Sequence, residues 1–239
     1  MNSNAPVVEL KNVCQSYGDK AILLDFNAQF EANKITAILG KSGGGKSTLL
    51  QLINGTIKPD SGDIKLYGQS LDYENIAAVR QKIGFVFQFI GLFPHLTNEK
   101  NITLLAYILK LSQQEISTRL HYLLDAVCLP KTYLDKFPYQ LSGGEQQRVG
   151  LCRAFFLKPP LILMDEPFAS LDYDTKNAIY EYIQRIRKDE NLSIIIVTHQ
   201  YEEAKILADN YMWMDEGKIK VAGNNDELIN IKKDYTLTI

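Results

Sequence analysis

A glycine-rich segment that directly follows an apolar run constrains this chain more than any other feature. Ile35–Leu39 is nearly all apolar, and the next nine residues, from Gly40 to Thr48, read GKSGGGKST. This spacing matches G-x-x-x-x-G-K-[ST], in which glycines let successive backbone N–H groups curl around phosphate oxygens. A helix that begins near Lys46 would point its positive dipole end at the same anion. The segment therefore predicts a phosphate-binding loop; the alternative is a flexible glycine turn between a strand and a helix.

Two side chains of this loop are expected to bind what the glycines enclose. Lys46 should reach the β- and γ-phosphates of a nucleotide. The hydroxyl of Ser47 should be offered to Mg²⁺. The loop therefore predicts a nucleotide bound together with Mg²⁺.

A second apolar run ends in two carboxylates. Leu161–Met164 precedes Asp165 and Glu166, and α/β sheets bind ligands beyond the carboxyl ends of their strands. We expect Asp165 to hold the Mg²⁺ hydration shell and Glu166 to polarise the attacking water beside the γ-phosphate. The alternative is a surface turn with solvated acids, which the presence of the phosphate loop disfavours.

Hydrophobic periodicity indicates an α/β fold. Ile194–Val197 has the same apolar character as the two runs above, and short buried strands that alternate with helical patterns are typical of a mainly parallel sheet. Phe26, Ala28 and Phe30 alternate with polar residues, which predicts a strand with one polar face.

A helical insert interrupts this pattern. From about Leu92 to Lys158 the periodicity is helical and no strand-like run occurs. Ser112 and Glu115 form a capping-box pattern, which predicts the start of a helix. Its expected buried face consists of Ile116, Leu120, Leu123 and Leu124.

Composition excludes several classes of protein. The 239 residues are 46% hydrophobic and 23% charged, a balance typical of soluble globular proteins rather than disordered chains or disulfide scaffolds. The net charge of −2 gives no electrostatic reason to expect nucleic acid or anionic lipid as the main partner. The longest apolar run, Leu104–Leu109, is far shorter than the about 20 residues of a spanning helix. Cys14, Cys128 and Cys152 form no CxxC pair, and we expect reduced thiols buried in the packing.

The segment Leu141–Arg148, which reads LSGGEQQR, distinguishes among proteins with such a phosphate loop. Ser142 and Glu145 satisfy a helix capping box, and the same geometry makes an anion site from N–H groups and a hydroxyl. Here the sequence resembles the ATP-binding-cassette (ABC) family, whose signature is LSGGQ, with Glu145 in place of the commoner Gln. The resemblance covers almost the whole chain, and the motifs occur in the family's order.

The resemblance implies a fold and a domain organisation. The fold is an α/β P-loop NTPase (RecA-like) core with N-terminal antiparallel β strands and an inserted α-helical subdomain. Residues 1–239 then form a single ABC ATPase domain, with the core in 1–88 and 159–239 and the helical subdomain at about 89–158. In that family the signature loop of one subunit binds the γ-phosphate held by the phosphate loop of another.

Two further positions match contacts of the family with the nucleotide. Tyr17 lies where the family places an aromatic side chain that stacks on adenine; the alternative is a tyrosine packed locally in a loop. Gln88 follows the strand-like run that begins at Gly84 and resembles the Q-loop glutamine, which senses Mg²⁺ and the γ-phosphate. The alternative for Gln88 is an ordinary glutamine at a strand end.

Two positions match the family's dimer interface and switch. Asp172, in the tripeptide SLD, resembles the D-loop that crosses the interface; the competing interpretation is a helix capped by Ser170. His199 ends a β-branched strand as the family's switch histidine does, and would contact the γ-phosphate and organise the attacking water. Gln200 stands where the family usually has Asp, which leaves the support of His199 open.

The expected site residues fall into three groups. The catalytic residues are Lys46, Glu166 and His199. The metal ligands are Ser47, Gln88 and Asp165. The nucleotide contacts are Tyr17, Gly40, Lys41, Ser42, Gly43, Gly44, Gly45, Lys46, Ser47, Thr48, Gln88, Ser142, Gly143, Gly144, Glu145 and Asp172.

The family implies an ATP-hydrolysing subunit of a transporter, with ATP and Mg²⁺ bound and two copies paired head-to-tail as a homodimer. Membrane permease subunits would hold it at the cytoplasmic face of the inner (plasma) membrane, with a solute-binding protein as an indirect partner. The apolar stretch Ile90–Thr97 begins the helical insert, and Phe89, Leu92 and Phe93 would form a groove for a short permease helix. The alternative for these residues is core packing.

Two other classes compete with a transporter subunit. A soluble ABC ATPase that works on DNA or ribosomes would carry long coiled coils or two cassettes, and this sequence shows neither. A small-molecule P-loop kinase would give no role to the LSGGE segment or to His199.

The transported solute is predicted least directly, because the ATPase does not touch it. Chain length and Leu92–Thr97 resemble the ATPases of polar amino-acid importers, which favours a solute such as glutamine. Ile90–Phe93 and Pro159–Leu163 resemble equally the ATPases of osmoprotectant (glycine betaine) importers. We expect uptake of a polar amino acid, with osmoprotectant uptake as the alternative.

Overall fold

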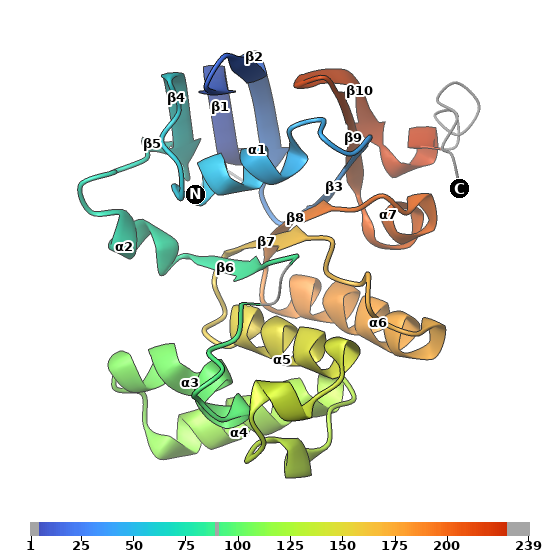
Figure 1. Ribbon diagram of the computed structural model, residues 1–239. Helices are drawn as coiled ribbons and strands as arrows, with labels where there is room; N and C mark the ends of the chain where they lie inside the picture. Colours follow the sequence, from blue (N-terminus) through green and yellow to red (C-terminus); the bar gives the residue numbers. More distant parts are fainter. Residues whose placement is uncertain (1–4, 89–90, 229–239) are drawn as a thin grey trace. The chain divides into compact units, whose positions relative to one another are not determined.

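The computed structural model describes residues 5–88 and 91–228, and the chain forms two compact units (Figure 1). The first unit combines Met1–Arg80 with Ser193–Ile239, and the second unit is Gln81–Leu192. Both units contain buried strands and helices, so each has an apolar core of its own.

An antiparallel sheet in the first unit has the strand order β2-β1-β4-β5. The strands are β1 (Pro6–Tyr17), β2 (Lys20–Glu31), β4 (Ser61–Leu66) and β5 (Gln69–Ser70). The alternation predicted for β2 is confirmed, because Phe26 and Phe30 are buried whereas Asn27 and Gln29 are exposed. The N-terminal antiparallel strands implied by the resemblance are therefore present.

A second group of strands in the first unit runs in the order β10-β9-β3-β8. These strands are β3 (Ile35–Gly40), β8 (Ser193–Val197), β9 (Asn210–Asp215) and β10 (Lys218–Asn224). β3 pairs in parallel with both β8 and β9, and β10 pairs antiparallel with β9. Every residue of β3 and β8 is buried, as their apolar runs predicted. Among the described residues of this unit, the helices are α1 (Lys46–Ile53), α2 (Ile76–Arg80) and α7 (Tyr201–Leu207), with a 3₁₀ turn at Asn225–Glu227.

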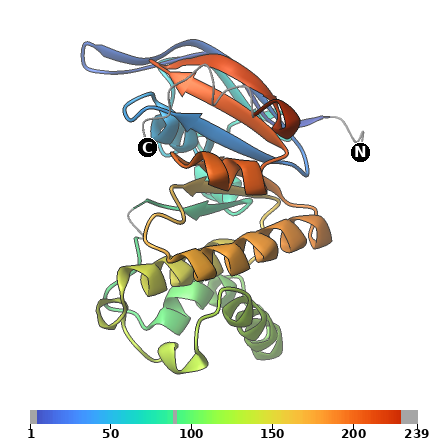
Figure 2. The same ribbon diagram turned by 90° about the vertical axis from the view of Figure 1, so that its right-hand side faces the viewer.

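The second unit contains the parallel strands β6 (Ile83–Val86) and β7 (Leu161–Asp165). The helical insert predicted between them is confirmed. Its elements are α3 (Asn98–Ile108), α4 (Gln113–Ala126), α5 (Gly143–Phe155) and 3₁₀ turns at Lys131–Tyr133 and Pro138–Gln140. α6 (Tyr173–Asp189) follows β7 as a long straight helix, drawn in orange in Figure 2.

The start and the buried face of α4 agree with the sequence prediction. The Ser112 hydroxyl accepts a hydrogen bond from the Glu115 N–H at 3.3 Å, and the Glu115 carboxylate accepts one from the Ser112 N–H at 2.9 Å. The buried residues of this helix are Ile116, Leu120, Leu123 and Leu124. Within residues 5–88 and 91–228, no helix combines the length and the apolar character that a bilayer span requires.

The cysteines correct one expectation. Cys152 is buried in α5, and desolvation raises the pKa of its thiol to about 12. Cys14 is half-buried, but Cys128 is exposed, so the expectation that all three pack inside the protein is wrong. Cys128 follows the last turn of α4 with a φ of +53°, and this left-handed helix end turns the residue out to solvent.

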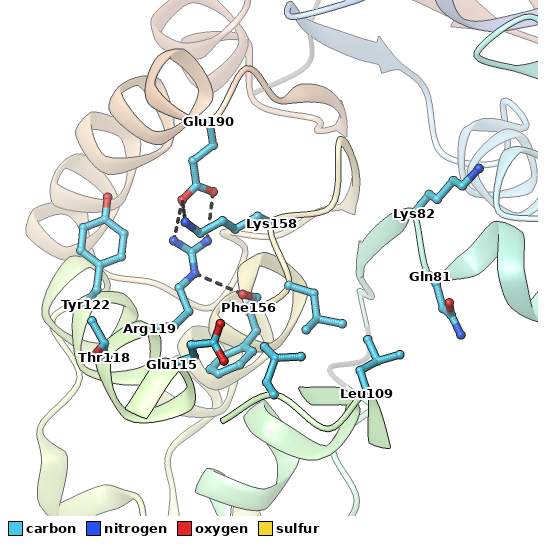
Figure 3. A pocket seen from close by; sticks show the side chains of 12 residues that line it. Gln81, Lys82, Leu109, Glu115, Thr118, Arg119, Tyr122, Phe156, Lys158 and Glu190 are labelled. Atoms are coloured by element: carbon cyan, nitrogen blue, oxygen red, sulfur yellow. Dashed lines mark hydrogen bonds and ion pairs between the residues drawn. The ribbon is translucent and has the colours of Figure 1, made fainter. Parts of the chain in front are cut away.

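One ion pair ties three helices of the second unit together (Figure 3). The Arg119 guanidinium, on α4, donates to both carboxylate oxygens of Glu190, at 2.6 and 3.0 Å. The same guanidinium donates to the carbonyl oxygens of Phe155 and Phe156, at 2.6 and 3.1 Å. Because Glu190 follows α6 and the two phenylalanines end α5, one side chain fixes the ends of both helices to α4.

Three of these residues, Arg119, Phe156 and Glu190, form one wall of a pocket of about 780 Å³. Lys82, just before β6, and Lys158, just before β7, also line it. The pocket therefore lies at the amino ends of the two strands, whereas the predicted site residues of this unit follow their carboxyl ends. Because the charges of Arg119 and Glu190 pair with each other, we infer that they stabilise the packing of the helices rather than bind a ligand.

Replacing the arginine tests that role. Arg119→Met leaves the mostly buried Glu190 carboxylate with only the exposed Lys158 ammonium group, at 3.8 Å. Breaking a buried ion pair in this way typically costs about 3 kcal/mol or more. We expect urea denaturation to show this loss in the free energy of unfolding. The exposed Arg185 of α6 is the matched control, and Arg185→Met should change the value by less than about 0.5 kcal/mol. Equal effects of the two substitutions would contradict the structural role.

Candidate nucleotide site

The predicted phosphate loop joins the end of β3 to the start of α1 in the first unit. At Gly40 the backbone passes so close to β9 that a Cβ atom would lie 1.8 Å from the Met214 carbonyl oxygen. The φ of Gly40 is +143°, in a region that favours glycine. The turn after β9 holds the loop a second time, because the Gly217 N–H donates to the Gly44 carbonyl oxygen at 3.2 Å. The backbone of this segment is therefore held at Gly40 and at Gly44.

The lysine of this loop is buried and curls back over it. Lys46 Nζ donates to the carbonyl oxygens of Gly40 at 2.8 Å and Lys41 at 2.7 Å. These contacts hold the ammonium group above the loop backbone, at the start of α1. An ammonium group in this position supplies positive charge where the loop would receive an anion.

The first turn of α1 presents backbone donors to the same place. Its N-cap is Gly45, in a left-handed conformation with a φ of +93°, and no side chain caps the helix. The first N–H groups of a helix have no partner within the helix, so those of Lys46, Ser47 and Thr48 point to the loop side. The backbone N–H groups and the ammonium group are donors that suit a phosphate chain, and the oxygen of the exposed Ser47 hydroxyl suits Mg²⁺.

His199 lies at the same edge of these strands as the phosphate loop. Val197 of β8 pairs with Ile38 of β3, and the Thr198 N–H donates to the Ile38 carbonyl oxygen at 3.2 Å. Two residues beyond this pair, one strand reaches Gly40 and the other reaches His199. The histidine is exposed there, so the parallel register brings these two predicted site residues to one edge.

The turn that carries His199 is closed by residues that the sequence analysis did not single out. The Thr198 hydroxyl forms a hydrogen bond with the carboxylate of Glu203, which is buried on α7. The same hydroxyl accepts a hydrogen bond from the Gln200 N–H at 3.0 Å. Support for the His199 turn thus comes from Thr198 and Glu203. The acidic residue Glu203 in the first turn of the helix is visible in the sequence, but its hydrogen bond with Thr198 is seen only in the structure.

Tyr17 ends β1 in the first unit and remains 50% exposed. A tyrosine packed locally in a loop would bury most of its ring. The exposed ring leaves a face available for stacking on a planar ligand.

In the second unit, parallel pairing brings Gln88 to Glu166. Val86 of β6 pairs with Met164 of β7, and the two site residues each lie two positions beyond this pair. Gln88 Nε2 donates to Glu166 Oε2 at 3.3 Å. Asp165 ends β7 and is buried, so it delivers a carboxylate from the sheet.

The signature segment forms the amino end of α5. Ser142 is the N-cap: its hydroxyl accepts from the Glu145 N–H at 3.3 Å, and the Glu145 carboxylate accepts from the Ser142 N–H at 2.8 Å. This contact with the Ser142 N–H lowers the pKa of Glu145. The capping-box interpretation of this segment is therefore confirmed, and Glu145 faces its own helix end.

Asp172 is itself the N-cap of α6, and its carboxylate accepts a hydrogen bond from the Thr175 N–H at 2.9 Å. That backbone contact lowers the pKa of Asp172. The competing interpretation, in which Ser170 caps the helix, is wrong because the helix begins two residues later than it requires.

The apolar stretch after Gln88 is partly exposed. Phe93 is 43% exposed and Leu92 is half-buried, whereas Phe89 lies outside the described residues. The buried amide of Asn101 fixes this stretch: it accepts from the Phe93 N–H at 2.7 Å and donates to the Phe93 and Leu96 carbonyl oxygens at 3.0 and 3.1 Å. Phe93 is therefore held at the surface and is not part of the core.

Each unit thus gathers its own part of the predicted site. The first unit holds the phosphate loop, Tyr17 and His199, and the second holds Gln88, Asp165, Glu166, the signature segment and Asp172. A residue that the sequence analysis passed over, Gln147, lies buried beside Glu166.

The sequence profile of a family described as ABC transporter matches residues 23–169. The chain is 37% identical over 229 residues to the choline transport ATP-binding protein of Bacillus subtilis (strain 168), covering 95% of this chain and 60% of that relative. It is 35% identical over 218 residues to the glycine betaine uptake system ATP-binding protein of Escherichia coli (strain K12), covering 91% of this chain and 71% of that relative.

A solved structure supports the same fold. It is a dimeric ATP-binding cassette in a post-hydrolysis state bound to ADP and Pi, 31% identical, with a TM-score of 0.85. The match covers 91% of this chain and 98% of that chain. By contrast, the chain spans about 60% of the length of the choline transport relative.

Proposed function

Because this chain belongs to the ABC transporter family, we propose that it binds and hydrolyses ATP as the energy-supplying subunit of a membrane transporter. The observation that carries this proposal is the buried ammonium group of Lys46, held over the phosphate loop by two carbonyl oxygens. A buried lysine on glycine-rich backbone has little packing value, whereas it is well suited to a phosphate chain.

The phosphate loop supplies the binding part of this function. Backbone N–H groups of Ser42–Thr48 and the Lys46 ammonium would hold the β- and γ-phosphates. The exposed ring of Tyr17 would stack on adenine, which needs only a flat face. Gly40, whose backbone touches β9, fixes where the loop begins.

Three of the predicted site residues carry oxygen atoms that suit Mg²⁺. Ser47, Asp165 and Gln88 each offer a hard oxygen, the ligand type that this ion prefers. When bound, the ion would neutralise charge on the β- and γ-phosphates. Ser47 would bind it directly, and Asp165 would hold its hydration shell.

Glu166 is the proposed general base. Its carboxylate would accept a proton from the attacking water and so orient that water toward the γ-phosphate. The Gln88 amide already contacts this carboxylate and would hold its direction. His199, on a turn held by Thr198 and Glu203, would contact the γ-phosphate.

The signature segment would complete the site in trans. Each chain carries one phosphate loop and one signature segment, so a pair with two-fold symmetry gives two equivalent composite sites. The residues expected to face the partner's nucleotide are Ser142, Gly143, Gly144, Glu145 and Asp172. The capped amino end of α5 suits this role, since a helix N-terminus attracts phosphate.

Phe93 would receive the transporter's membrane subunits. Asn101 holds the ring at the surface, next to the segment that follows Gln88. An apolar helix from a permease would bury this ring, which would couple the state of Gln88 to the membrane partner. Such contacts would place the chain on the cytoplasmic face of the membrane, beside permeases that a solute-binding protein supplies.

For the transported solute we propose an osmoprotectant of the glycine betaine or choline type. The relatives named for choline transport and glycine betaine uptake support this alternative better than they support a polar amino acid such as glutamine. These relatives are ATP-binding proteins, and this is the part that they share with the present chain. The solute itself would be recognised by the permease.

Lys46→Ala tests nucleotide binding. Hydrogen bonds to charged groups contribute about 1.5–3 kcal/mol each, so we expect the Kd for Mg·ATP to rise about 30-fold or more in calorimetry. Lys11→Ala, an exposed lysine on β1, is the control and should leave the Kd unchanged. Thermal unfolding should show that both variants fold. Wild-type affinity in folded Lys46→Ala would show that the loop does not hold the phosphates.

Phe93→Asp tests the docking surface. A charge in place of this ring should lower uptake of glycine betaine into vesicles containing the permease about tenfold or more, because buried aromatic contacts dominate such interfaces. Basal ATP hydrolysis by the free chain should stay within about twofold. Leu24→Asp, on the exposed face of β2, is the control for an added surface charge. A parallel loss of basal hydrolysis in Phe93→Asp would assign Phe93 to packing instead.

A further inference from the structure

A buried glutamine of α5 links two points of the loop that follows β7. Gln147 is 2% exposed, and its Nε2 donates to the Glu166 carbonyl oxygen at 3.2 Å. Its Oε1 accepts a hydrogen bond from the Ser170 N–H at 3.4 Å. A carbonyl can only accept and an N–H can only donate, so these two partners fix the orientation of the amide. The side chain therefore spans the turn between Glu166 and Ser170.

This turn contains a backbone conformation that needs support. Glu166 has a φ of +47°, in the left-handed region that is unfavourable for a residue with a Cβ atom. Such conformations persist where the surroundings hold them. The Glu166 carbonyl oxygen accepts from the Ala169 N–H at 3.4 Å as well as from Gln147. The amide of Gln147 is thus one of the groups that hold Glu166 in this conformation.

The same helix face touches the turn at a second point. A Cβ atom on Gly144 would lie 2.8 Å from the Ser170 carbonyl oxygen, so the signature glycine packs directly on this backbone. Gly144 and Gln147 are three residues apart on α5 and share one face. The signature end of α5 and the Glu166 turn are therefore in close contact within one chain.

We propose that Gln147 is a positioning residue for ATP hydrolysis, which holds the backbone of Glu166 so that its carboxylate faces the attacking water. This rests on the proposed role of Glu166 as the base. Gln147 touches main-chain atoms of the turn, and the Glu166 side chain is held separately by Gln88. If Gln147 positions Glu166, then α5 has two roles: it would bind the nucleotide of the partner chain, and it would set the geometry of the base in its own chain.

Gln147→Met removes both hydrogen bonds and keeps a similar shape. Small displacements of a catalytic group can cost about 100-fold in rate, so we expect kcat for ATP to fall about 10- to 100-fold. KM should stay within about threefold, because ATP would be bound by Lys46 and Ser47 of the phosphate loop, which the substitution leaves in place. A kcat within about twofold of wild type would overturn the proposal.

Two further variants separate positioning from general stability. Asn98→Leu removes another buried amide of the second unit, one that donates to the Tyr133 carbonyl oxygen at 2.9 Å. It should lower Tm by a similar amount but leave kcat within about twofold. Gln147→Glu, at pH 8, keeps an acceptor for the Ser170 N–H and loses the donor to Glu166, so its kcat should be as low as that of Gln147→Met. Wild-type kcat in Gln147→Glu, or equal loss of kcat in Asn98→Leu, would overturn the proposal.

Glu166→Gln, assayed in parallel, distinguishes this inference from the function beneath it. An inactive Glu166→Gln with an active Gln147→Met overturns the role of Gln147 alone. Wild-type turnover in Glu166→Gln overturns the role of the base and this inference together.

Discussion

Parallel pairing of buried strands positions the polar groups of the candidate site. In the first unit, β3 and β8 run side by side, and their carboxyl ends lead into the phosphate loop and His199. In the second unit, β6 and β7 do the same for Gln88 and Glu166. Because buried strands cannot shift register without exposing apolar side chains, each pair holds its polar groups at one edge.

Much of this arrangement could be predicted from local patterns. Each of these patterns spans only a few consecutive residues, and each is confirmed. They are the apolar runs of β3, β7 and β8, the alternation in β2 and the capping box of α4. The roles of Gln147 and Glu203 could not be predicted, because their partners lie far along the chain or require a defined turn. The exposure of Cys128 does not follow from its residue type, because the left-handed end of α4 turns it out to solvent.

The signature segment shows how one motif can satisfy two demands. As a capping box, it stabilises α5, and Glu145 accepts the hydrogen bond that a glutamine at this position could also accept. The contact with the Ser142 N–H lowers the pKa of Glu145 and sets its charge against the positive helix end. The negative charge that Glu145 adds relative to the commoner glutamine is therefore matched by the positive end of its own helix.

The central claim is that two copies of the chain share two composite ATP sites. The most direct test is the mass of Glu166→Gln by size-exclusion chromatography with light scattering. Slow turnover keeps ATP in place, so the account predicts a monomer without nucleotide and a dimer at saturating ATP. Adding Ser142→Arg places a bulky cation at the signature end of α5 and should abolish the dimer, although each chain still binds ATP. A Glu166→Gln protein that stays monomeric at saturating ATP would contradict the account.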